Sequence, residues 1–184
     1  TANDDAKLIF QSDPVGFNGV NFSGFEGGDN SSVINGTLNI IRSNNTIELV
    51  GKYLNVLIPS GLSANNYSIS YQNGNYEIVP ADELLIKIDN QTIIYGNDSS
   101  NFNIISGQYY SSITNQYVTL NPPLKSGKVY TYTDALSGAA IFSLGAISPQ
   151  FSSTNILAVG NYEIEAKDIT ETSDNFSNNI TVVG

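Results

Sequence analysis

The chain has 184 residues, of which 40% are apolar and only 13% are charged, so it is too apolar for a disordered chain and too lightly charged for a coiled coil. Seven basic residues against 17 acidic ones give a net charge of −10, and such a surface repels the phosphates of nucleic acid and of anionic lipid. Cys, His, Met and Trp are absent, which excludes disulfides, nucleophile arrangements built on His or Cys, and the common zinc sites.

The first half of the chain predicts short β-strands. The runs at 37–41, 66–71 and 75–79 are rich in Ile, Val, Tyr and Thr, and several of them alternate apolar with polar residues. Asn73 and Gly74 stand between the last two runs, and both residues tolerate positive φ. The sequence therefore predicts a tight hairpin at these two residues.

A short helix near 29–35 is the one helical prediction. Asp29 or Asn30 provides its N-cap, and Gly36 provides its end. Ser and Asn are indifferent helix formers, so we expect no more than a turn or two.

The second half of the chain also predicts strands, and no helix. Strand-like runs occupy 84–88, 116–120, 128–133, 139–145 and 161–166. No run approaches the 18 apolar residues of a membrane-spanning helix, so we expect no membrane insertion. Because the chain contains no Met, we also expect it to be a piece of a longer protein.

Two pairs of segments indicate an internal duplication. "LIFQSDPVGF" at 8–17 aligns without a gap with "IIYGNDSSNF" at 93–102, and "VGKY" at 50–53 recurs as "VGNY" at 159–162. Thirteen positions after each Tyr comes "NY" or "NF", so that Tyr67 matches Phe176. We therefore expect a mainly β protein with two tandem modules at 1–82 and 83–184, the second lengthened by extra strands within 103–158. The repeated aromatic residues are expected to pack in the two cores.

Calcium is the metal that the acidic residues favour, because it takes oxygen ligands. The candidates are Asp168, Glu171 and Asp174, although no run matches a complete calcium-binding loop. A Lys–Asn isopeptide bond is a further candidate feature, with Lys7, Lys52 or Lys87 as its lysine. Paired carboxylates could in principle hydrolyse glycosides, but no apolar pocket that would raise a pKa is visible, and we expect no catalysis.

Tyrosines are the candidate ligand-binding residues. Exposed aromatic rings often mark contacts with carbohydrate or protein. The alternative is that tyrosine, a favoured strand residue, packs its ring and leaves its hydroxyl in water. The candidates cluster in the longer copy, at Tyr109, Tyr110, Tyr130 and Tyr132.

The ordered motifs resemble a known family. The stretch from "TANDDAKLIFQSDP" through "GFEGGDNSSVINGTL" to "YQNGNYEIVPA" resembles the MBG repeat of large bacterial surface and secreted proteins. "DNQTIIYG" at 89–96, "GQYY" at 107–110, "YTYTDALSG" at 130–138 and "DNFSNNITVVG" at 174–184 resemble a longer variant, the YGX type. The first copy departs from the pattern, because Phe10-Gln11 stands where the family shows Tyr-Gly.

The resemblance implies an architecture and a role. Such repeats occur in tandem in giant exoproteins of the filamentous-haemagglutinin kind, often exported by two-partner secretion, and the fold they imply is β-grasp-like or an immunoglobulin-like sandwich. A helix at 29–35 would favour the β-grasp form. The implied function is a non-catalytic spacer in an extracellular or outer-membrane-associated adhesin, without a cofactor, whose partners are neighbouring repeats of the parent chain. Alternatively, the module itself binds a glycan or a host surface protein.

Overall fold

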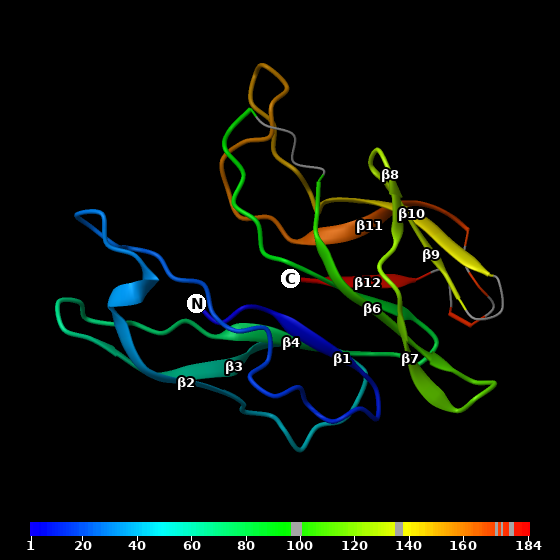
Figure 1. The fold of residues 1–184 in the computed structure, drawn as a ribbon, viewed down its shortest axis with the longest axis horizontal. Helices are drawn as coiled ribbons and strands as arrows, with labels where there is room; N and C mark the ends of the chain where they lie inside the picture. The colour runs from blue at the N-terminus through cyan, green and yellow to red at the C-terminus, as the bar shows by residue number, and fades with distance from the viewer. Residues whose placement is uncertain (97–100, 135–137, 172, 174, 177–178) are drawn as a thin grey trace. The chain divides into compact units, whose positions relative to one another are not determined.

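The protein is almost entirely β-structure, as the sequence predicts. A computed structural model describes residues 1–96, 101–134, 138–171, 173, 175–176 and 179–184 (Figure 1). The described chain forms two compact units, Thr1–Ile78 and Val79–Gly184, whereas the sequence placed the join after residue 82. Within the described residues, no helix is long and apolar enough to cross a membrane.

The first unit contains one four-stranded sheet. Its strands are β1 (Asp5–Leu8), β2 (Ile34–Arg42), β3 (Gly51–Ala64) and β4 (Gly74–Val79), in the order β1-β4-β3-β2. β3 runs antiparallel to both of its neighbours, β2 and β4. Because alternate residues of a strand face the same side, the strands supply one apolar core, formed by Ala2, Ile40, Leu57, Tyr76 and Ile78.

The predicted helix exists only as a single 3-10 turn, Ser31–Val33. Its N-cap is Asn30, whose side-chain oxygen accepts a hydrogen bond of 2.9 Å from the backbone N–H of Ser32. The predicted end at Gly36 is wrong, because Gly36 already lies inside β2, opposite Leu62. The turn is too short to cover the sheet as a helix would.

The hairpin predicted at Asn73-Gly74 is wrong. Residues 66–71 form no strand, and Gly74 is instead the first residue of β4, paired with Leu57 of β3. A Cβ on Gly74 would lie 2.8 Å from the carbonyl oxygen of Ala2. Glycine is needed there because the N-terminal segment passes close to it, and this contact is remote in sequence.

The second unit is a sandwich of two four-stranded sheets (Figure 1). One sheet has the order β12-β5-β6-β7 and the other the order β11-β10-β9-β8. The strands are β5 (Leu84–Ile88), β6 (Ile104–Ser111), β7 (Gln116–Leu120), β8 (Leu124–Ser126), β9 (Val129–Thr133), β10 (Ala139–Ala146), β11 (Ile164–Glu171) and β12 (Ile180–Val183). The segment 103–158 therefore carries β6 to β10, which agrees with the expectation of added strands.

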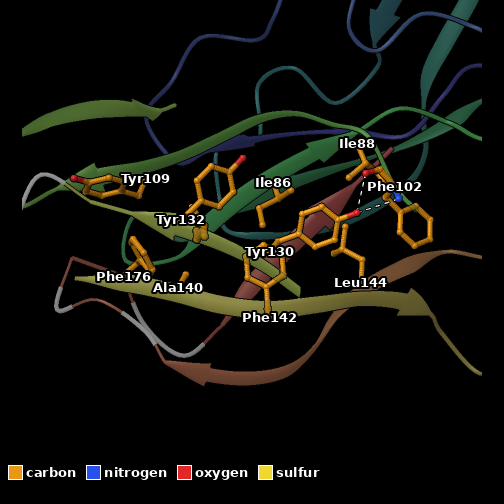
Figure 2. Close-up of a cluster of buried hydrophobic side chains, with 11 residues drawn as sticks. Ile86, Ile88, Phe102, Tyr109, Tyr130, Tyr132, Ala140, Phe142, Leu144 and Phe176 are labelled. Carbon is orange, nitrogen blue, oxygen red and sulfur yellow. Dashed lines mark hydrogen bonds between the residues drawn. The ribbon is translucent and has the colours of Figure 1, made fainter. Parts of the chain in front are cut away.

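The core of the second unit fills the space between its two sheets. Ile86 of β5 faces inward from one sheet, and Phe142 and Leu144 of β10 face inward from the other (Figure 2). Leu84 of β5 belongs to the same core. Phe176, which follows β11, joins them from outside the strands. Both sheets thus bury one face against the other, which is the arrangement of a β-sandwich.

Candidate functional site

Three of the four candidate tyrosines lie in the core of the second unit. Tyr109, Tyr130 and Tyr132 are only 1–2% exposed, and Figure 2 shows them among the other buried rings. Phe142 stacks on Tyr130 and on Tyr132, with ring centroids 5.9 and 6.4 Å apart. Burial raises the pKa of Tyr132 to about 12. A buried ring offers no face to a ligand, so these three residues pack the sandwich.

Tyr110 is the candidate that lies nearer the surface. It is half-buried on β6, directly opposite Tyr117 of β7, and the two rings meet edge to face with centroids 5.1 Å apart. Its hydroxyl lies 3.4 Å from the side-chain oxygen of Asn115. This cross-strand pair is the part of the predicted tyrosine site that a ligand could reach.

The three metal candidates are not brought together in the described residues. Asp168 is exposed and accepts a hydrogen bond of 2.7 Å from the hydroxyl of Ser143. Glu171 is placed by its backbone at the end of β11, and Asp174 lies outside the described residues. Among the residues that can be described, no group of three or more acidic side chains is placed to hold a metal ion.

An ion network lies across the sheet of the first unit. The ammonium group of Lys7 lies 2.9 Å from Asp13 and 2.6 Å from Glu48, and the guanidinium of Arg42 binds the same two carboxylates, with 2.8 Å to Asp13. Both cations are buried, whereas the Asp13 and Glu48 side chains are 24% and 45% exposed. Tyr76 adds a hydrogen bond of 3.1 Å to Asp13, and its ring lies under the guanidinium.

The network keeps its acids ionised. Burial alone would raise the pKa of Asp13, but hydrogen bonds and charge from Lys7 and Arg42 outweigh burial and hold that pKa below its ordinary value. The hydrogen bond from Lys7 likewise lowers the pKa of Glu48. Burial, followed by the nearby charge of Asp13, raises the pKa of the Tyr76 hydroxyl. We therefore assign the network to structure, since it joins β1, β2 and the two loops that carry the acids.

This network also bears on the isopeptide expectation for Lys7. Lys7 does meet side chains with a carbonyl group, but they belong to Asp13 and Glu48 rather than to an asparagine. Amide formation requires a neutral amine and a protonated carboxyl group. The lowered pKa of Asp13 favours the ionised carboxylate instead, so the geometry supports ion pairs and not a covalent bond.

A small aromatic cluster holds the loop that precedes the 3-10 turn. Phe25 meets Tyr67 edge to face, with centroids 5.9 Å apart, and lies 6.2 Å from Phe22. The hydroxyl of Tyr67 donates a hydrogen bond of 2.7 Å to Asp29. The predicted packing role of Tyr67 therefore concerns this surface cluster and not the main core of the unit.

The tyrosine of the repeated Val-Gly-x-Tyr motif makes the same kind of hydrogen bond in both units, although Tyr53 lies within β3 and Tyr162 lies before β11. The hydroxyl of Tyr53 donates to the carbonyl oxygen of Leu49 at 2.7 Å, and that of Tyr162 donates to the carbonyl oxygen of Ala158 at 3.0 Å. Each ring also lies close to the glycine two positions earlier. In the first copy, a Cβ on Gly51 would lie 3.9 Å from the hydroxyl oxygen of Tyr53. This is the arrangement of a tyrosine corner.

The site that the sequence analysis missed is the ion network. Four residues of the network are scattered over 7–48, and their charges alone gave no pattern. Arg42, however, is the lone arginine of the chain and directly follows the apolar residues Ile40 and Ile41 at the end of β2. A buried arginine almost always has acidic partners, and this signal could have prompted a search for them.

Comparison with known proteins assigns the first unit. The family model described as MBG domain (YGX type) matches residues 1–77. This range ends one residue before the end of the first unit, Thr1–Ile78. We had expected the YGX-type features in the second half of the chain instead. No curated protein and no solved structure matches the chain. Residues 1–77 of this chain are therefore similar to the MBG domain of the YGX type.

Proposed function

We propose that the chain is a non-catalytic spacer in a bacterial surface or secreted adhesin, where tandem β units hold a distal binding region away from the cell. The observation that carries the proposal is the shared corner at Tyr53 and Tyr162, one in each unit. A motif whose tyrosine makes the same hydrogen bond in both halves supports descent of the two units from one repeat. Repeats of this kind build stalks of adjustable length.

The connection between the units supports the same role. β4 ends at Val79 and β5 begins at Leu84, so residues 80–83 join the two units. Pro80 restricts the backbone at the start of this connection. A connection of this length transmits tension from one unit to the next with little slack.

Display on a bacterial surface tests the spacer role. The chain is inserted between a membrane anchor and a reporter binding domain, and capture of reporter-coated beads is measured against a fusion without the chain. We expect capture to require the reporter domain and to be unchanged by Tyr110→Ala. The chain displayed without the reporter domain should bind nothing, including immobilised glycans.

Binding by the chain alone would favour the alternative function. If the chain without the reporter bound a glycan or a host protein saturably, and Tyr110→Ala abolished this binding, the Tyr110–Tyr117 pair would be a ligand site. The spacer proposal would then be replaced by the adhesive one.

A further inference from the structure

The first and last strands of the second unit lie side by side and parallel. β5 and β12 pair over four positions, from Ile180 opposite Leu84 to Val183 opposite Lys87. The chain enters the unit just before Leu84 and reaches its last residue just after Val183. Tension on the two ends of the unit therefore acts at opposite ends of this pair, which we call the terminal-strand ladder.

We propose that the terminal-strand ladder is a mechanical clamp that resists stretching of the protein. In this parallel geometry, tension slides β12 along β5, so all the hydrogen bonds of the ladder are strained together. An antiparallel hairpin pulled from its open end loses its bonds one after another. The biological role of this clamp rests on the proposed function, because only a protein that acts as a spacer would bear such tension.

Side chains strengthen the ladder at the point where tension enters. The carboxylate of Glu83, immediately before β5, accepts hydrogen bonds from Thr181 of β12 at 2.9 Å and from Asn179 at 3.4 Å. Sliding of β12 along β5 breaks these two bonds together with the backbone ladder. They therefore raise the force that the same pair of strands withstands.

Apolar packing protects the ladder from water. Leu84 and Ile86 of β5 are fully buried, and Ile180 and Val182 of β12 pack against the same core. At the far end, a Cβ on Gly184 would lie 2.5 Å from the Ile88 side chain, so the chain end is seated closely against β5. Water cannot readily replace strained hydrogen bonds that apolar side chains cover.

The first unit repeats this arrangement. β1 and β4, its first and last strands, are neighbours in the sheet. The N–H of Ala2 donates to the carbonyl of Gln72 at 2.9 Å, and the N–H of Asn75 donates to the Asp4 side chain at 2.7 Å. These contacts occur in the same order along both segments, as they do in a parallel pair. Tension on the ends of either unit therefore strains paired terminal strands.

Pulling one protein in two directions tests the clamp. Because the chain has no cysteine, single cysteines can serve as handles. In the first geometry, cysteines are appended at both chain ends, so that β5 and β12 slide past each other. In the second, exposed Asn90 becomes cysteine and is used with the C-terminal handle, so that force acts at one end of the ladder and peels it.

The length released identifies the unit that unfolds. In the first geometry, the extended chains of Thr1–Ile78 and Val79–Gly184 give roughly 260–280 Å and 350–380 Å, less the folded end-to-end distances. In the second geometry, force acts only on the chain from residue 90 to residue 184, which gives roughly 310–340 Å. We expect the second unit to unfold at roughly two- to fourfold higher force in the first geometry, because up to four residue pairs share the load there. Equal or lower force in that geometry would overturn the clamp.

A side-chain variant provides a second reading. Thr181→Val removes the hydroxyl that binds Glu83 while keeping the shape of the side chain. We expect it to lower the unfolding force in the first geometry and to leave the peeling force unchanged; an unchanged force in the first geometry would contradict the contribution of this bond. Neither measurement involves a ligand or a cell surface, so failure of the clamp is distinguishable from failure of the spacer role.

Discussion

The hydroxyl of Tyr130 makes two hydrogen bonds to the backbone of Phe102. It donates to the carbonyl oxygen at 2.8 Å and accepts from the N–H at 3.1 Å, and all of these groups are buried (Figure 2). The segment before β6 is thereby fixed to β9 in the opposite sheet. Tyr130, a candidate ligand-binding residue in the sequence, instead joins the two layers of the sandwich.

Tyr130→Phe should therefore destabilise the second unit. The substitution keeps the ring but leaves the buried N–H and carbonyl of Phe102 without this partner, which costs about 1–3 kcal/mol. Urea unfolding followed by signals of β9 and β10 measures the loss. The matched control is Tyr110→Phe, whose nearer-surface hydroxyl lies 3.4 Å from Asn115 and should matter little. Equal effects of the two substitutions would contradict the assigned roles.

The ion network makes the first unit sensitive to acid. The pKa values of Asp13 and Glu48 are lowered on folding, so their contribution to stability is complete above their ordinary values of 3.8 and 4.5 and is lost as the pH falls through the folded values. NMR signals of β1 and β4 should therefore report unfolding when the pH is lowered from 5 towards about 2. Stability that stays constant over this range would contradict the prediction.

Asp13→Asn is the matched test at neutral pH. It removes a charge that Lys7 and Arg42 share, and the resulting imbalance around buried cations should cost the first unit roughly 1–3 kcal/mol. The acid sensitivity of the variant should also be smaller, because one of the two shifted carboxylates is gone. Denaturant unfolding at two pH values measures both the loss of stability and the acid sensitivity. If the stability of the variant fell with pH as much as that of the parent protein, groups other than Asp13 would cause the acid sensitivity.

The tyrosine corners predict unit-specific effects. Tyr53→Phe should destabilise the first unit and Tyr162→Phe the second, each by about 0.5–1.5 kcal/mol, because one hydrogen bond is lost in each case. Hydrogen exchange of the two sheets, measured separately, locates each effect. If either substitution changed both units equally, the corners would not belong to separate folding units.

Gly61 of β3, which lies close to the backbone of β2, predicts a severe local effect of substitution. A Cβ on Gly61, which has a φ of +89°, would lie 2.2 Å from the carbonyl oxygen of Thr37. Gly61→Ala should therefore cost roughly 2–4 kcal/mol through strain and overlap. Gly27 also has a positive φ, of +63°, but nothing lies near its Cβ position, so Gly27→Ala isolates the backbone strain alone. Similar losses of stability in the two variants would contradict the close approach of β2 and β3 at this point.

Local patterns were sufficient to predict several strands of this protein. β5 and β7 have the predicted bounds, 84–88 and 116–120, because apolar and β-branched residues there are bounded by turn residues. The alternation in "VYTYT" also predicts that Tyr130 and Tyr132 share a face. It does not say whether that face is buried, because only the second sheet, which lies far away in sequence, decides this.

Contacts between distant segments explain what the sequence could not predict. Gly74 looked like a turn residue, but its role is set by the N-terminal segment at Ala2. The ion network likewise depends on Lys7 and Glu48 meeting across the fold, although each is unremarkable among its sequence neighbours. The repeated Val-Gly-x-Tyr motif was visible because its geometry is local.

Separating the two halves of the chain tests the central claim of two repeated folding units. Residues 1–81 and 82–184 are produced as separate polypeptides, and their amide NMR spectra are overlaid on that of the intact chain. If each half closes its own core, both spectra will be dispersed and will match the intact protein except near the cut. A collapsed spectrum from either half would show that one shared core holds the protein together, and would contradict the account.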